Sequence, residues 1–522
     1  MGFDQNVTPP PEGTSYARPS PAQAAADAIP ILVDDTYHIF HLTTPPFTRH
    51  HPPRLRSSWS RLRSKDLVSW TRDPQPVLVP AADASDPDAD GIWTGAATIA
   101  PDGCMNIFYT GYNLSQNGKQ VILRTKSQDH HGSSFQQPGA EIIIEGDNLS
   151  QYEDIDFRDP YVFFNEQEGK YWMLVATRLR TGPHWTRGCI ALLTSTNLDR
   201  WSVEPEPLYS PNDMLCPECP ELFTLGNGMW YLMYSRFHAP NAGTVYRVAT
   251  SPRGPFRIPR DGSHGRLDGR RWYAAKSCPK AGDPTKRISF GWLGDYVEEE
   301  GKWLWGGDLG VPRELSADSQ GNLQVEVASE VVNHLEQTYV PLSQRLLPST
   351  VKLSCIGATA TTFPDLQLDN RDVYMTFGIA THSAHSFGLI LQADQEHKGH
   401  RLQFSPSSDG KYTVTLLTDF PALDDFWADQ YKLYLPKAVD GPELVRHESV
   451  DLTAGVSLLL KAQTIQIFCG GRSISFRLPL SEDSLGSTTG GQRNHPKPLG
   501  WFVEDGEAEL NNIVIRVEER ET

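Results

Sequence analysis

Three acidic residues, Asp27, Asp159 and Glu218, each precede a short apolar segment by a similar number of residues. Cleavage of a glycosidic bond needs a carboxylic acid that protonates the leaving oxygen, and a carboxylate that attacks the anomeric carbon or activates water. A third acidic group can bind the sugar hydroxyls and tighten that contact in the transition state. Three carboxylates that converge on one pocket would therefore supply the parts of a glycosidase.

The elements that must position these carboxylates form a repeat. Apolar segments recur about every 60 residues with turn residues between them, which is typical of folds built from repeated β units; they begin at Tyr37, Met105, Tyr171, Trp230 and Arg287. Five such units predict a propeller of five blades, each a four-stranded sheet. Because equivalent positions in a radial fold face one axis, we expect the three carboxylates at equivalent positions around a central pocket.

Composition limits the size of the fold and the class of partner. A chain of 522 residues exceeds one compact core and predicts two domains. The formal net charge of -17 argues against nucleic acid or an anionic membrane as a partner, since both attract clustered Lys and Arg. We expect a neutral small molecule or oligosaccharide as substrate. The oligomeric state stays open.

The N-terminus and the hydropathy pattern bear on location. No segment has the roughly 18 consecutive apolar residues that a membrane helix requires. The first residues are polar and lack the charged and apolar regions of a signal peptide. The sequence as written therefore predicts a cytoplasmic protein, and a secreted one if the N-terminus was processed or replaced.

We expect an all-β chain in four parts. Residues 1–22, rich in Pro, Ser and Ala, predict a flexible arm. The propeller, with the catalytic residues, is expected over 23–325, followed by a linker over 326–344 with helical character at Ser329–Gln337. Short alternating strands over 345–522 predict a β-sandwich.

Cysteine and histidine patterns give no sign of a metal centre. The seven cysteines are an odd number and scattered, so no disulfide framework is expected. Cys216 and Cys219 form a Cys-x-x-Cys pair without a second pair, which makes a zinc site improbable. His130 and His131 show no spacing shared with carboxylates and are interpreted as solvated loop residues. We therefore expect no metal and no organic cofactor.

Several motifs occur in an order that resembles glycoside hydrolase family 32, the invertases, inulinases and levanases. They include Phe157-Arg-Asp-Pro160, Glu218-Cys-Pro-Glu-Leu-Phe223 and Trp93-Thr-Gly-Ala96, and also segments 64–70, 108–111, 272–275 and 311–315. The resemblance covers nearly the whole chain and implies a five-bladed propeller with a C-terminal β-sandwich. It implies that Asp159 stabilises the transition state through the sugar hydroxyls, that Glu218 is the general acid/base, and that Trp93 and its neighbours line the sugar pocket.

The first motif departs from the family pattern. The chain has Ala25-Ala-Asp-Ala-Ile-Pro-Ile31, in which Asp27 stands where the resemblance places the nucleophile, and Leu42 replaces a sugar-binding Gln. Some members have a shortened form at this point, so catalysis need not be lost. The change puts the identity of the substrate in doubt.

Each proposed site residue has a structural alternative. Asp34 and Asp35 are rivals of Asp27, although their place before a strand favours a turn. Glu221 is a rival of Glu218, but the repeat register favours Glu218.

The sugar contacts are less well defined. Arg158 and Thr94 lie in the family motifs and are candidates for substrate binding, and Arg158 next to Asp159 would form only a weak ion pair, since neighbours on a strand face opposite ways. Trp93 is the best candidate for a sugar platform because sugar faces stack on aromatic rings. Further aromatic candidates, which could equally be core residues, are Trp59, Tyr273 and Trp292.

The sequence thus predicts a retaining glycosidase that releases fructose from β-fructofuranosides such as sucrose, inulin or levan, with fructosyl transfer open. A glycosidase for another furanoside, such as an arabinofuranoside or a difructose dianhydride, is the alternative within the enzyme class. A non-catalytic carbohydrate-binding protein on the same scaffold is the alternative outside it. A release assay on sucrose, inulin and levan separates enzyme from binding protein.

Overall fold

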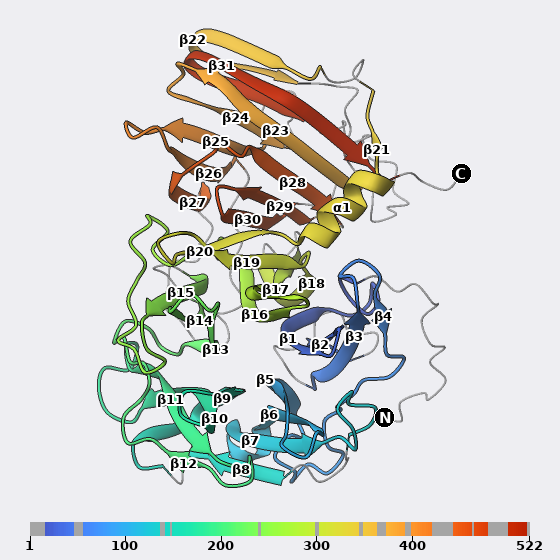
Figure 1. Cartoon of the computed structure of the whole chain (residues 1–522), viewed down its shortest axis with the longest axis vertical. Coiled ribbons are helices and arrows are strands. Elements are labelled where there is room, and N and C mark those ends of the chain that lie inside the picture. Colours follow the sequence, from blue (N-terminus) through green and yellow to red (C-terminus); the bar gives the residue numbers. More distant parts are fainter. Residues whose placement is uncertain are drawn as a thin grey trace. The chain divides into compact units, whose positions relative to one another are not determined.

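A computed structural model describes most of the chain: residues 16–45, 56–135, 141–146, 149–237, 242–297, 302–343, 348–362, 372–391, 398–419, 442–461, 464–478 and 499–518. Strands dominate these residues (Figure 1). The chain divides into two compact units, one of residues 1–257, 273–295 and 304–312, the other of 258–272, 296–303 and 313–522. No helix among the described residues is long and apolar enough to cross a membrane.

The first unit is built of antiparallel sheets that follow one another around a ring in chain order (Figure 1). The first blade has β1 (Ala25–Val33), β2 (Thr36–Thr43), β3 (Ser58–Ser64) and β4 (Thr71–Arg72). The second has β5 (Gly91–Ile99), β6 (Met105–Asn113), β7 (Lys119–Lys126) and β8 (Glu141–Glu145). The third has β9 (Tyr152–Asn165), β10 (Lys170–Leu179), β11 (Gly188–Ser195) and β12 (Ser202–Val203).

The last two blades complete the ring. The fourth contains β13 (Glu218–Thr224), β14 (Trp230–Arg236) and β15 (Gly243–Ala249), and the fifth contains β16 (Trp272–Lys280), β17 (Asp283–Val297) and β18 (Lys302–Leu309). Strand β18 pairs with β1 through Ala25 and Gly307, which joins the end of the ring to its start. The first strands β1, β5, β9 and β13 lie next to one another, so they form the inner wall of the propeller.

The apolar repeat segments are buried because each blade is covered on both faces. In β10, Met173 and Val175 pack into a cluster with Phe108 and Ile122 of the second blade. The alternate residues Trp172 and Leu174 pack with Leu222, Leu232 and Tyr234 of the fourth blade. Since successive side chains of a strand face opposite sides, a strand between two blades must be apolar throughout.

Residues 16–22 fall within the expected N-terminal arm, and Arg18 ties them to the propeller. Its guanidinium donates to the carboxylates of Asp295, at 2.9 Å from Nη2, and Asp308, at 2.5 Å from Nε. The side chain of Arg18 is only 11% exposed. Residues 1–15 of that arm lie outside the described residues.

The second unit contains α1 (Ser329–Thr338), which agrees with the helical segment expected at Ser329–Gln337. Its strands are β19 (Arg313–Ala317), β20 (Leu323–Val327), β21 (Val340–Pro341), β22 (Val351–Thr362), β23 (Val373–His382), β24 (Ser386–Leu391), β25 (His400–Pro406), β26 (Tyr412–Thr418), β27 (Glu443–Val450), β28 (Val456–Lys461), β29 (Thr464–Cys469), β30 (Arg472–Arg477) and β31 (Gly500–Val517). The long strand β31 pairs with β22, β23 and β24 and so joins the sheets of the sandwich.

Three segments expected within the propeller group with the second unit: 296–303, and the two that Arg313 connects, 258–272 and 313–325. Arg313 shows why. It is buried and donates to Asp268 at 2.6 Å and to the sandwich hydroxyls of Ser473 and Ser475. A buried guanidinium must be paired, so this network holds both segments to the sandwich strands.

Candidate active site

The inner strands of the propeller are interrupted at corresponding places by irregular backbone. Asp27, Asp159, Cys219 and Ala274 have positive φ angles of 36°, 55°, 52° and 48°. Around the first three, the strand pairing skips, which marks a β-bulge in β1, β9 and β13. A bulge re-aims side chains, and non-glycine residues in this strained region of φ and ψ cluster at functional sites.

The strand register corrects the expected equivalence of the three carboxylates by one residue. Arg158 pairs with Ala176 just before the bulge in β9, and Glu218 pairs with Ser235 just before the bulge in β13. Glu218 therefore corresponds to Arg158, and Cys219 corresponds to Asp159. Counting residues back from the second strand of each blade does not reveal this correspondence, because the turn between the first and second strands differs in length between blades.

Asp27 is held by two side chains from other blades. Thr94 Oγ1 of the second blade donates to Asp27 Oδ2 at 2.5 Å, and Trp292 Nε1 of the fifth blade donates to Oδ1 at 2.8 Å. Asp27 itself is partly exposed. The two donors fix the plane of a carboxylate that remains accessible, which suits a nucleophile.

Asp159 is fixed mainly by the backbone of the fourth blade. The amide of Cys219 donates to Asp159 Oδ2 at 2.9 Å, and the Cys219 thiol lies 3.6 Å from the same oxygen. The thiol also lies 4.0 Å from Asp27 Oδ2, so one sulfur atom contacts both aspartates. Burial raises the pKa of the Cys219 thiol well above its usual range, and the charges of Asp159 and Asp27 raise it further. The thiol is thus neutral and does not add negative charge between them.

Glu218 is buried and is held by a cation and a phenol. Arg158 Nη2 donates to Glu218 Oε1 at 2.9 Å, and Tyr273 OH donates to Oε2 at 2.5 Å. Arg158 also binds Asp156, while its Nε lies 3.9 Å from Asp159 Oδ2. The expected weakness of the Arg158–Asp159 pair agrees with this longer distance, since the guanidinium is directed mainly at Glu218 and Asp156.

The rival carboxylates occupy other environments. Glu221 is fully buried and accepts hydrogen bonds from Ser277 and Arg287, at 2.8 Å from each side chain. Burial raises the pKa of Glu221, and the charge of Arg287 acts against this. Asp34 and Asp35 form the exposed turn between β1 and β2, as their sequence context indicated. None of the contacts described for these three residues involves Asp27, Asp159 or Glu218.

The four aromatic candidates divide into two pairs. Tyr273 and Trp292 contact Glu218 and Asp27 respectively, and their ring centroids lie 5.9 Å apart. Trp59 is completely buried and donates to the backbone oxygen of Trp93, which places it in the core. Trp93 is 5% exposed and one face of its ring stacks on Tyr112, at 4.2 Å between centroids.

Sequence reasoning missed the residues that support the site from behind. Asp156 binds Arg158 and accepts from Arg178 at 2.9 Å, and Thr110 Oγ1 accepts from the amide of Asp159 at 2.8 Å. Cys219 lies in the Glu218–Phe223 motif, but the sequence assigns it no contact with the aspartates. These residues lie in the motifs or next to them, but the spacing of the motifs does not show which side chains form hydrogen bonds with one another.

Taken together, the inner wall presents an accessible carboxylate, a buried carboxylate between an arginine and a tyrosine, and a third carboxylate fixed by a backbone amide. A pair of carboxyl groups in unlike environments is the arrangement that glycoside cleavage uses, one as acid and one as nucleophile or base. The geometry therefore fits the chemistry expected from the motifs.

Residues 28–326 match the family model described as the glycosyl hydrolases family 32 N-terminal domain. This chain belongs to glycosyl hydrolase family 32. The match begins one residue after Asp27, so membership in the family rests on the rest of the propeller and leaves the role of Asp27 to its geometry.

Two plant proteins are among the curated relatives of this family 32 chain. An insoluble isoenzyme of β-fructofuranosidase from Arabidopsis thaliana is 26% identical over 358 residues, covering 63% of this chain and 59% of the relative. A fructan 6-exohydrolase from Beta vulgaris is 26% identical over 376 residues, covering 67% and 60%. The chain thus spans about three fifths of the length of these relatives.

Solved structures extend the likeness over the whole chain. A fructan 1-exohydrolase IIa from Cichorium intybus has a TM-score of 0.67 at 17% identity, covering 99% of this chain and 98% of that one. An exo-inulinase from Aspergillus awamori has a TM-score of 0.66 at 16% identity, covering 98% and 99%. The expected fold class, a five-bladed propeller followed by a β-sandwich, is confirmed.

Proposed function

We propose that this protein is a retaining glycosidase that releases fructose from β-fructofuranosides. The observation that carries the proposal is the placement of Asp27, Asp159 and Glu218 on the inner wall, each held by different donors. The named activities of the relatives, a β-fructofuranosidase and a fructan exohydrolase, support the choice of a fructosyl substrate.

In the first step, Asp27 attacks the anomeric carbon of the fructosyl unit while Glu218 protonates the departing oxygen. The bond to the leaving group breaks and a covalent bond to Asp27 forms. Thr94 and Trp292 orient the attacking carboxylate, since their donors fix both of its oxygens.

In the second step, Glu218 removes a proton from water, which attacks the same carbon and releases Asp27. Asp159 binds ring hydroxyls, and these bonds strengthen as charge develops in the transition state. Arg158 and Tyr273 hold Glu218 in place for both proton transfers. A sugar in place of water would give fructosyl transfer with the same residues.

The test is release of fructose from sucrose, inulin and levan by the wild-type chain and by Asp27→Asn and Glu218→Gln. Each variant keeps the shape of its side chain but removes the chemistry, so turnover falls by several orders of magnitude while the circular dichroism spectrum is unchanged. Near-normal turnover in Asp27→Asn would exclude Asp27 as the nucleophile.

A second measurement separates retention from inversion. With methanol as the acceptor, two successive displacements give a methyl β-fructofuranoside, whereas a single displacement gives the α-anomer. No release from any of the three substrates would favour the carbohydrate-binding alternative or a different furanoside. Binding of these sugars without release of fructose would favour the carbohydrate-binding protein over a glycosidase for a different furanoside.

A further inference from the structure

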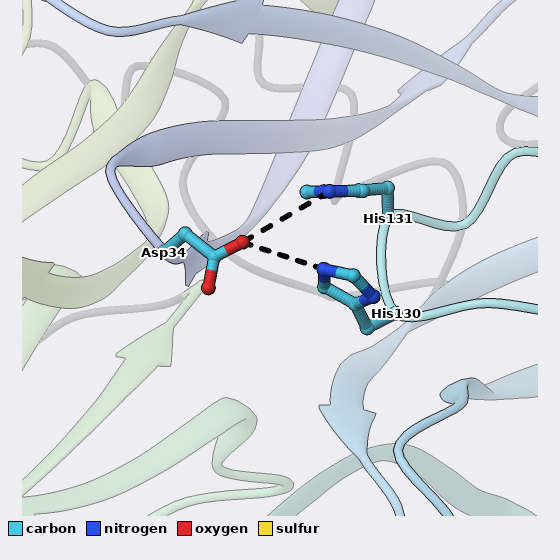
Figure 2. Close-up of side chains that lie close together, drawn as sticks. All are labelled: Asp34, His130 and His131. Carbon is cyan, nitrogen blue, oxygen red and sulfur yellow. Dashed lines mark ion pairs between the residues drawn. The ribbon is translucent and has the colours of Figure 1, made fainter.

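We propose that Asp34, His130 and His131 form a binding site for a divalent transition-metal ion such as Zn²⁺, between the first and second blades. Figure 2 shows both imidazole rings directed at one carboxylate oxygen of Asp34. Asp34 lies far from the two adjacent histidines in the sequence, and none of the three residues belongs to the site of the proposed glycosidase.

The distances suit a small ion. His130 Nε2 lies 3.3 Å and His131 Nε2 lies 3.9 Å from Asp34 Oδ2, and one potential ligand atom from each residue lies within 4.8 Å of the others. Tetrahedral zinc with bonds of about 2.0–2.1 Å to nitrogen and oxygen places its ligand atoms roughly 3.3–3.5 Å apart. Two imidazoles and a carboxylate thus need only small side-chain rotations to share one ion.

The backbone that carries the histidines is already fixed. Arg61 of β3, itself buried, donates from Nη1 to the backbone oxygens of His131 at 3.0 Å and Gly132 at 2.8 Å. Asp129 Oδ1 accepts from the amide of Ser133 at 3.1 Å and closes the same turn. Because this backbone is already fixed, only the side chains lose conformational entropy when an ion binds.

His38 is a buried neighbour of His131. It is 2% exposed, neither of its ring nitrogens has a hydrogen-bond partner among the described residues, and its ring stacks on that of His131 at 6.2 Å between centroids.

The ligand types select the class of metal. Imidazole nitrogens with one carboxylate favour Zn²⁺, Ni²⁺, Co²⁺ or Cu²⁺ over Ca²⁺ or Mg²⁺, which prefer oxygen ligands only. The three side chains are 47% to 66% exposed, so water can complete the coordination. Asp34 comes from the β1–β2 turn and the histidines from the turn after β7, so a bound ion would connect two blades.

The sequence pattern favours solvated histidines because Asp34 lies far from them in the chain. The radial fold brings a hairpin turn of one blade beside the outer loop of the next, and this proximity has no local signature.

The experiment is isothermal titration of the untagged full chain with ZnCl₂, and with CoCl₂ while visible absorption is recorded. We expect saturable binding and Co²⁺ absorption bands, with the affinity reduced tenfold or more in Asp34→Asn, His130→Gln and His131→Gln. The temperature of thermal unfolding should rise with Zn²⁺ in the wild-type chain and not in these variants, since an ion that binds only the folded state stabilises it.

Two substitutions are matched controls. Asp35→Asn changes the other acidic residue of the same turn, which pairs with Lys65, and His334→Gln removes an exposed histidine from α1. Both should bind the ion like the wild-type chain. The proposal is overturned if no saturable binding occurs, or if affinity in the three ligand variants equals that in the two controls.

Discussion

Arg158 links the stability of the propeller to its proposed chemistry, and Arg158→Met tests that link. The guanidinium is 1% exposed and pairs with Glu218 and Asp156, both of them buried. Methionine fills similar space without the charge, so packing is largely kept while two carboxylates lose their cation. Glu218 keeps the hydroxyl of Tyr273 and Asp156 keeps Arg178.

The size of the effect follows from burial. Removing one partner of a buried ion pair typically costs about 3–5 kcal/mol, because the remaining charge is left uncompensated. Because Glu218 and Asp156 each keep one donor, we expect Arg158→Met to lower the free energy of unfolding by about 3 kcal/mol, the lower end of this range. Arg253→Met is the matched control, since Arg253 pairs with Glu168 at 2.7 Å but is 45% exposed. Pairs of that kind contribute about 0–1 kcal/mol.

The pH dependence gives a second readout. Burial of Asp156 opposes its ionisation, but Arg158 and Arg178 outweigh burial and lower the pKa of Asp156 below its usual range. A lowered folded-state pKa stabilises the fold above the unfolded-state pKa of about 3.9, and this contribution is lost as the pH falls through the folded-state pKa. The gap in unfolding free energy between wild type and Arg158→Met should therefore be widest at pH 7 and narrow towards pH 3.

Urea unfolding followed by tryptophan fluorescence at pH 7, 5 and 3 measures both effects. Turnover on sucrose should fall in Arg158→Met, because Glu218 loses the donor that orients it, and should persist in Arg253→Met. An Arg158→Met variant no less stable than Arg253→Met at pH 7, or a gap that does not change with pH, would refute the reasoning.

Three further expectations concern the same wall of the propeller. Glu221→Gln should lower the free energy of unfolding by roughly 3 kcal/mol, because buried Arg287 loses its charged partner. Turnover of the folded protein should stay within about twofold, and urea unfolding and a fructose assay measure the two effects. A large loss of turnover would make Glu221 a candidate for the general acid again. Cys219 should resist iodoacetamide in the folded protein at pH 8 and react after unfolding, since burial raises its thiol pKa; rapid labelling of the native chain, mapped by mass spectrometry, would contradict this. A crystal soaked with a fructoside should place the carboxyl groups of Asp27 and Glu218 roughly 5 to 6 Å apart, and about 9 Å would indicate inversion.

Much of the fold was predictable because its information is local and repeated. Each blade needs an apolar strand covered on both faces, so the segments at Tyr171 and Trp230 are apolar throughout. Regular spacing of such segments is enough to indicate a propeller. The helix at Ser329–Thr338 was also predictable, since its pattern differs from that of the strands around it.

The exact register was not predictable in the same way. Counting residues placed Glu218 level with Asp159, whereas the pairing of β13 with β14 aligns Glu218 with Arg158. Both strands carry the same bulge, but the turn between the paired residues Thr224 and Trp230 is one residue shorter than the turn between Phe164 and Tyr171, so the count from the next strand is off by one.

The sequence by itself determined the repeat and the fold class and proposed the three candidate carboxylates, because these depend on residue type and on spacing along the chain. Only the tertiary structure decided their partners: Trp292 on Asp27, the Cys219 amide on Asp159, and Arg158 with Tyr273 on Glu218. It also brought Asp34 beside His130 and His131. The physical reason is that each of these contacts joins different blades, and the closing of the ring sets those distances.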